Sequence, residues 1–205
     1  METVLEFLVK IDQTIFFLIN GGVGTYTLID SAARIIASDY LIPVSFSLVL
    51  IFIWFREDTL SLRMAGRVAV LKSISTLLAS CFLVLVLNGI VFRERPFNLP
   101  DSNLIFYAPT DSSFPSNSFA AVMGMALPIF SSYKVLGRIM LFASFCLGFG
   151  RILVGIHFPG DVVGGLLVAL VSFWITVRLF HIFNRQIITL IILLEKAKWL
   201  QVFRI

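Results

Sequence analysis

The sequence has little charge, few cysteines and almost no histidine. Only 14% of its 205 residues are Asp, Glu, Lys or Arg, whereas 59% are hydrophobic, and the mean hydropathy is +0.98. This balance lies outside that of soluble globular domains. It argues against a nucleic-acid-binding protein, despite an isoelectric point of 9.3. Cys81 and Cys146 fall in separate apolar runs, so we do not expect a disulfide.

The first twenty residues lack both the basic start of a signal peptide and an uninterrupted apolar run. Residues 3–20 mix Glu6, Lys10 and Asp12 with regularly spaced apolar side chains. This pattern predicts an amphipathic helix lying along a membrane interface. We expect the N-terminus to be retained. Glycines end this helix, and residues 26–37 are predicted to form a second short helix.

Long apolar runs fill most of the remaining chain and predict an all-α fold. We expect spanning helices at residues 40–55, 68–91, 117–131, 137–154 and 160–180. Together they form one polytopic membrane bundle, a single domain over residues 1–205. Five spans are preferred, and residues 3–20 provide a sixth if they cross the membrane. The tail at 181–205 either extends the last helix or forms an interfacial helix.

Basic residues predict the orientation of this bundle. Eleven of the 16 Lys and Arg fall on loops or helix ends that the predicted spans place on one side. They are Arg56, Arg63, Arg67, Lys72, Lys134, Arg138, Arg178, Arg185, Lys196, Lys198 and Arg204. The positive-inside rule makes this side cytoplasmic. Residues 92–116 and 151–160 then share the opposite face.

On that opposite face lie three polar clusters, which are functional candidates because charge is costly in so apolar a chain. The first is Arg93–Pro96, the second is Ser113–Ser118, and the third is Arg151 with His157 and Asp161. Arg95 of the first cluster and Arg151 of the third are candidates for binding a phosphate group, since guanidinium groups donate paired hydrogen bonds to its oxygens. Arg93 can share the side of Arg95 on an extended segment. The alternative is nonspecific binding of lipid headgroups by loop arginines.

The second cluster precedes the apolar run at 117–131 and should form the first turn of that helix. Free backbone N–H groups there can hold an anion, and Ser116 and Ser118 can add hydroxyl donors. The alternative is plain capping of the helix by a serine.

His157 and Asp161 are one helical turn apart, so the carboxylate can fix the imidazole tautomer and stabilise the charge gained when a ring nitrogen attacks phosphorus. The alternatives are a satisfied interfacial histidine and a metal ligand. Metal binding is disfavoured because no second histidine or cysteine lies near in sequence.

These clusters resemble the motifs of the type 2 phosphatidic acid phosphatase family, which are Lys-x6-Arg-Pro, Pro-Ser-Gly-His and Ser-Arg-x5-His-x3-Asp. The corresponding residues are Asn88-x6-Arg95-Pro96, Pro115-Ser116-Asn117-Ser118 and Gly150-Arg151-x5-His157-x3-Asp161. The resemblance implies a metal-independent membrane lipid phosphatase with no cofactor. It also implies His157 as the nucleophile that forms a phosphohistidine, Asp161 as its partner, and Arg95, Arg151 and Ser116 as phosphate ligands.

Three positions depart from the family pattern. Asn88 stands where the family has lysine, a cationic contact that Arg93 can replace. Asn117 replaces a glycine beside the phosphate. Ser118 occupies the catalytic position of the general-acid histidine, and a serine cannot titrate near neutral pH, which predicts a rate loss of about 10²–10⁴ for poor leaving groups.

A lipid pyrophosphate tolerates this loss best, because its leaving group is a phosphate monoester. Residues 93–97 and 111–116 are most similar to undecaprenyl pyrophosphate phosphatases, so that lipid is the preferred substrate. Lipid A 1-phosphate and phosphatidylglycerophosphate are alternatives, as is a non-catalytic lipid-phosphate binder or transport component. No nucleic acid and no obligatory protein partner are expected. The predicted location is a bacterial inner membrane, with the site facing the periplasm or exterior.

Overall fold

A computed structural model describes residues 4–56 and 59–196. All regular secondary structure in these residues is helical, which confirms the predicted all-α class. The helices are α1 (Val4–Asn20), α2 (Thr27–Ile36), α3 (Leu41–Arg56), α4 (Leu60–Ile90), η1 (Pro96–Asn98), α5 (Asn117–Ser132), α6 (Lys134–Leu153), α7 (Pro159–Ile182) and α8 (Asn184–Lys196).

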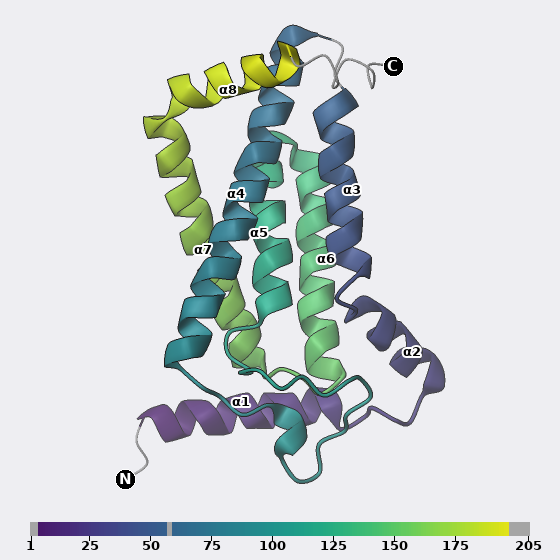
Figure 1. Ribbon diagram of the computed structural model, residues 1–205. Coiled ribbons are helices and arrows are strands. Elements are labelled where there is room, and N and C mark those ends of the chain that lie inside the picture. The colour runs from purple at the N-terminus through teal and green to yellow at the C-terminus, as the bar shows by residue number, and fades with distance from the viewer. Residues whose placement is uncertain (1–3, 57–58, 197–205) are drawn as a thin grey trace.

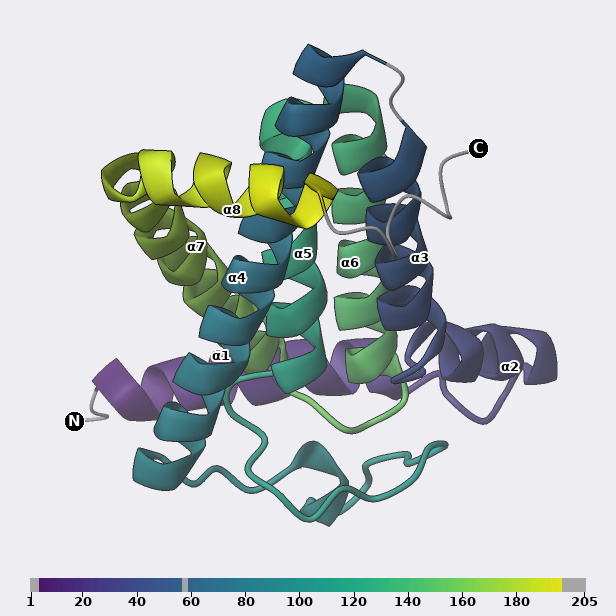
Figure 2. The same cartoon turned by 45° about the horizontal axis from the view of Figure 1, so that its top comes forward.

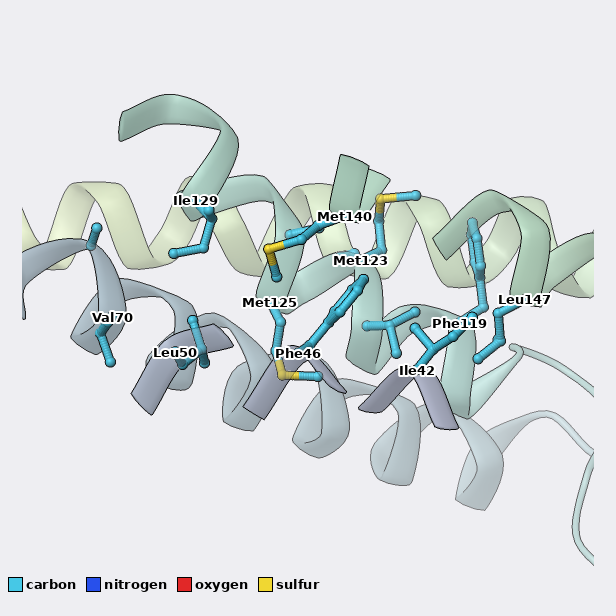
Figure 3. Close-up of a cluster of buried hydrophobic side chains, with 14 of the residues drawn as sticks. Ile42, Phe46, Leu50, Val70, Phe119, Met123, Met125, Ile129, Met140 and Leu147 are labelled. Atoms are coloured by element: carbon cyan, nitrogen blue, oxygen red, sulfur yellow. The ribbon is translucent and has the colours of Figure 1, made fainter. Parts of the chain in front are cut away.

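Helix α5 forms the centre of the bundle, and α3, α4, α6 and α7 surround it (Figure 1). Nine of its 16 residues are buried, because four helices pack around it. Phe119, Met123 and Ile129 pack there against Phe46 of α3 and Met140 of α6 in the main hydrophobic cluster (Figure 3). The helix that begins at the second polar cluster is therefore held firmly in place.

The five helices predicted as spans all form. Among the described residues, α4, α6 and α7 are each long and apolar enough to cross a membrane. Helices α2 and α3 qualify together as one span that is bent by 45°. Helix α5 is apolar but has 16 residues, fewer than the about 20 that a lone span needs.

Helices α1 and α8 lie across opposite ends of the bundle, as both views show (Figures 1 and 2). The orientation of α1 agrees with the predicted interfacial helix, and its Phe16 is fully buried against Phe158. Of the two alternatives for the tail, the structure shows a separate helix that turns away from α7. Residues 197–205 lie outside the described residues.

The two ends of the bundle differ in character. The segment between α4 and α5, the α6–α7 connection and α1 gather at one end (Figure 1). The basic side chains Arg56 and Lys134 lie at the other, where α3 ends and α6 begins. Arg56 and Lys134 are therefore at the end opposite the polar clusters, as predicted, whereas Lys198 and Arg204 lie outside the described residues. Cys81 and Cys146 are both free thiols.

Candidate active site

Residues of all three polar clusters meet where α5 and α7 begin. Backbone hydrogen bonds tie the segments together: Ser113 N donates to Arg93 O at 2.9 Å, and Ser116 N donates to Asp161 O at 2.9 Å. Gly164 and Gly165 allow this close approach of α7 to the 113–116 loop. A Cβ at position 165 would lie 2.8 Å from the carbonyl oxygen of Ser116, so any larger residue would push that loop away.

His157 is 1% exposed and lies in the connection between α6 and α7. Its Nδ1 lies 2.9 Å from the carbonyl oxygen of Ser113, a bond that requires the proton on Nδ1. Its Nε2 lies 3.5 Å from Nη1 of Arg95. The unprotonated nitrogen therefore faces the guanidinium group, the arrangement that a nucleophile attacking an arginine-bound phosphate requires.

Asp161 supports this histidine by charge rather than by a direct hydrogen bond. Its Oδ2 lies 3.6 Å from Nδ1 of His157, and its side chain is fully buried. It accepts hydrogen bonds from the Ser113 hydroxyl, from Phe158 N at 2.7 Å and from Nη1 of Arg93 at 2.7 Å. The Ser113 carbonyl fixes the tautomer of His157. The sequence pattern predicts this role for Asp161 instead.

Burial lowers the pKa of His157 from its ordinary value of 6.5, and the charges of Arg95 and Arg151 lower it further, whereas Asp161 opposes the shift. The imidazole is therefore neutral at pH 7 and becomes protonated, and non-nucleophilic, only as the pH falls below 6.5.

We expect this titration to be directly visible by NMR. The chain has two histidines, so His181→Asn leaves His157 as the only imidazole. In that variant, labelled with ¹⁵N-histidine in detergent, the imidazole signal should titrate with a midpoint below pH 6.5. A midpoint above 6.5 would contradict the electrostatic description of this site.

Arg95 is 6% exposed and held from several sides. Nε donates to Asp111 O at 3.0 Å, Nη1 to Ile156 O at 2.9 Å, and Nη2 pairs with the carboxylate of Asp111 at 2.8 Å. These bonds fix the guanidinium plane beside Nε2 of His157, so little ordering is needed when an anion binds.

Arg93 lies in a different place from the one predicted for a phosphate ligand. Its Nη1 pairs with Asp161 at 2.7 Å, its Nη2 pairs with Asp12 at 2.6 Å, and its guanidinium stacks 4.2 Å from the Phe158 ring centroid. Asp12 also accepts a 2.7 Å hydrogen bond from Gly160 N at the start of α7. This geometry favours a positioning role, in which α1 and Arg93 hold Asp161.

Asp12→Asn should therefore lower kcat by about 10- to 100-fold while changing KM less, because it removes the ion pair that holds Arg93 against Asp161. Steady-state kinetics in detergent micelles measures the effect. Asp101→Asn is the matched control, since Asp101 is an exposed carboxylate in the loop at the same end of the bundle. Equal kinetics in the two variants would exclude the positioning role.

Arg151 lies in the last turn of α6 and is 3% exposed. Its Nη2 pairs with Asp39, whereas its buried Nε has no hydrogen-bond partner among the described residues. Ser116 is fully buried, and its hydroxyl also has no partner there. Ser116 occupies the N-cap position of α5 without capping it, contrary to the alternative of plain capping. Two buried donors thus remain for a ligand.

The other three predicted site residues are placed as follows. The Ser118 hydroxyl donates to Asp39 at 2.9 Å. Asn117 is exposed at the first position of α5, and within the part of the chain that the structure describes no side-chain hydrogen bond ties it to the cluster. Asn88 lies in the last turn of α4, where its buried Oδ1 has no partner within the described residues.

Sequence reasoning missed Asp12, Asp39 and Tyr107 as members of the site. Tyr107 donates its hydroxyl hydrogen to Asp39 at 2.6 Å. The two aspartates carried a usable signal, since each interrupts apolar sequence as the nominated arginines do. Their contacts with Arg93 and Arg151 span 81 and 112 residues, which no local spacing can reveal.

Comparison with known proteins identifies the family. The model of the PAP2 superfamily matches residues 69–185, more than half of the chain. Undecaprenyl-diphosphatase BcrC of Bacillus subtilis (strain 168) is 28% identical over 157 residues, which cover 77% of this chain and 78% of that protein.

Two solved structures share the fold. LpxE of Aquifex aeolicus has a TM-score of 0.64 and 28% identity, covering 80% of this chain and 93% of that one. A PAP2-type phosphatidylglycerolphosphate phosphatase of Bacillus subtilis has a TM-score of 0.61 and 18% identity, covering 85% and 86%. The family match and the helical fold agree with the resemblance seen in the motifs: the chain belongs to the PAP2 superfamily.

Proposed function

We propose that this PAP2-type membrane lipid phosphatase hydrolyses a lipid pyrophosphate through a phosphohistidine at His157. The observation that carries the proposal is the orientation of His157, whose unprotonated Nε2 faces Arg95 while Nδ1–H is held by the Ser113 carbonyl. An imidazole held in this way has one free lone pair, which points at the place where an arginine would bind phosphate.

The phosphate itself would be held by Arg95, Arg151 and Ser116, with the N-terminus of α5 contributing backbone donors. The unpartnered Nε of Arg151 and hydroxyl of Ser116 support this assignment, because buried donors normally have acceptors. Nε2 attacks the terminal phosphorus, the bond to the bridging oxygen breaks, and the lipid monophosphate leaves. Asp161 stabilises the positive charge that the imidazole gains.

Ser118 favours a pyrophosphate as the substrate. An alkoxide leaving group needs an acid, and the hydroxyl of Ser118 is a poor one, whereas a phosphate monoester departs as a stable anion. We prefer undecaprenyl pyrophosphate, which agrees with the name of the Bacillus subtilis relative. Lipid A 1-phosphate and phosphatidylglycerophosphate remain the alternatives, and the second agrees with the name of the Bacillus subtilis phosphatase that shares the fold.

We also propose that the site faces the periplasm or exterior, since the basic end of the bundle would be cytoplasmic. A non-catalytic lipid-phosphate binder remains a candidate from a different class. A protein that only binds lipid phosphate does not require a fixed tautomer of His157 or a buried Asp161 beside it. The geometry therefore favours a catalytic function over simple binding.

Phosphate release by the purified protein in detergent tests this proposal. Undecaprenyl pyrophosphate, lipid A 1-phosphate and phosphatidylglycerophosphate are compared, each with and without a chelator. We expect the highest kcat/KM with the pyrophosphate and no change with chelator, since the proposed chemistry uses no metal. Tight binding without release would support the binder, and faster release from a monoester would overturn the substrate assignment.

A further inference from the structure

Asp39 lies in the short connection between α2 and α3, outside all three motifs, yet its carboxylate reaches the site. Its Oδ1 accepts hydrogen bonds from Ser118 Oγ at 2.9 Å and from Nη2 of Arg151. Its Oδ2 accepts one from the Tyr107 hydroxyl at 2.6 Å. The carboxylate is thus bound both to a phosphate-site arginine and to the serine at the acid position.

The Ser118 hydroxyl cannot titrate near neutral pH, but its hydrogen bond holds a titratable group, the Asp39 carboxylate, at the position of the family's general acid. A serine hydroxyl neither accepts nor donates a proton readily near neutral pH, but a carboxylate bonded to it can accept one. Asp39 is the only carboxylate in the described part of the chain with a hydrogen bond to Ser118.

Water can reach Asp39, which distinguishes it from the other acid of the site. The Asp39 side chain is 32% exposed, whereas that of Asp161 is fully buried. Asp39 and Tyr107 line a cavity of about 670 Å³, together with Arg34 and Ser38. A water molecule in this cavity can contact the carboxylate and exchange a proton with it.

The contacts of Asp39 exclude a role as proton donor, because three hydrogen-bond donors, one of them the Arg151 cation, keep its carboxylate ionised. The same contacts make it a weak base as long as no phosphoryl group is present. An ionised carboxylate has no proton to give to a leaving group, and a lipid monophosphate leaving group needs none. The second half of the reaction has the opposite need, because water must lose a proton as it attacks phosphorus.

We propose that Asp39 is the general base that activates water for hydrolysis of the phosphohistidine, an inference that rests on the proposed function. The oxygen of water bonds to phosphorus as its proton passes to the Asp39 carboxylate. The bond between phosphorus and Nε2 breaks, and its electron pair returns to the imidazole. Phosphate leaves, and Asp39 releases the proton to solvent through the cavity.

The phosphoryl group itself strengthens this base. A bound phosphoryl group would also interact with Arg151, so the Arg151 cation would stabilise the ionised Asp39 carboxylate less than before. A neighbouring anion also raises the proton affinity of a carboxylate. Asp39 thus becomes a better base at the stage when the phosphohistidine is present.

Rapid-quench measurements with undecaprenyl pyrophosphate, ³²P-labelled at the terminal phosphate, test the proposal. Asp39→Asn removes the basic oxygen while keeping a hydrogen-bond acceptor of the same size. We expect a burst of lipid monophosphate, accumulation of base-stable ³²P-protein, and phosphate release slowed by about 10²–10⁴-fold. Asp39→Glu, which keeps a carboxylate, should restore part of the release rate.

Asp111→Asn is the matched control. Asp111 also pairs with a phosphate-site arginine, Arg95, but the Ser118 hydroxyl donates its hydrogen bond to Asp39 and not to Asp111. It should not accumulate labelled protein. If Asp39→Asn leaves release unchanged, or slows it without a burst, Asp39 is not the base. If the wild-type protein neither releases phosphate nor becomes labelled, the proposed function itself fails, so the two failures are distinguishable.

Discussion

Replacing His157 with asparagine should abolish phosphate release, with a loss on the order of 10⁴-fold or more in kcat. The asparagine amide can still donate to the Ser113 carbonyl, as Nδ1 of the histidine does. It has no counterpart of Nε2, and no other imidazole belongs to the site, since His181 lies near the far end of α7. The measurement is phosphate release from undecaprenyl pyrophosphate in detergent.

Binding distinguishes lost chemistry from lost folding in this variant. Because Arg95, Arg151 and Ser116 are unchanged, His157→Asn should still bind phosphate, with a dissociation constant within about tenfold of the wild-type value as measured by calorimetry. A variant that binds phosphate but releases none supports the nucleophile assignment. Release at more than about a tenth of the wild-type rate would refute it.

Replacing Ser118 with histidine should raise phosphate release from monoester lipids by about 10²–10⁴-fold, and from a pyrophosphate by less. Position 118 is in the first turn of α5, and its hydroxyl already contacts the Asp39 carboxylate. An imidazole there would gain an acidic partner that favours its protonated form, which is the form that protonates an alkoxide. Lipid A 1-phosphate and phosphatidylglycerophosphate serve as the monoester substrates.

The control for this gain is Ser132→His, the same change at the opposite end of the same helix. It should leave all rates unchanged. A gain confined to monoesters would support pyrophosphate as the substrate of the present sequence. A uniform gain from near zero would indicate an inactivated enzyme, and no gain with any lipid would contradict the acid assignment.

The fold could be predicted largely from the hydrophobic runs, because each is long and bounded by polar or glycine-rich sequence. The range 117–131 corresponds closely to α5 (Asn117–Ser132), and 160–180 to α7 (Pro159–Ile182). The behaviour of the tail could not be predicted, since a short apolar run fits either a continued helix or a separate one. Tertiary packing favours the separate helix, because Ile191 of α8 is fully buried.

The site could be predicted only where its residues form local patterns. The spacing of His157 and Asp161, and Arg95 before a proline, are visible in sequence. The role of Arg93 was not, because its two carboxylate partners, Asp12 and Asp161, come from distant helices. The sequence pattern is the same whether an arginine near a phosphate site binds the phosphate or holds the carboxylate that supports the nucleophile.

A consequence is that α1 belongs to the active site even though it lies across the bundle. Asp12 bonds to Arg93 and to Gly160 N, and Asn20 donates to the carbonyl oxygens of Asn103 and Leu153 at 2.8 Å each. These contacts join α1 to the polar end of the bundle at two places. A helix that lies across one end of the bundle thus also holds the candidate catalytic residues in place.

His157 should carry the phosphoryl group during turnover, and direct detection of that group is the decisive measurement. The purified protein is reacted with ³²P-labelled undecaprenyl pyrophosphate, quenched with base within milliseconds and digested, and the label is located by mass spectrometry. We expect phosphate on Nε2 of His157, and none in His157→Asn under the same conditions. Phosphate release at the full rate with no labelled histidine, or with the label on another residue, would contradict the proposed mechanism.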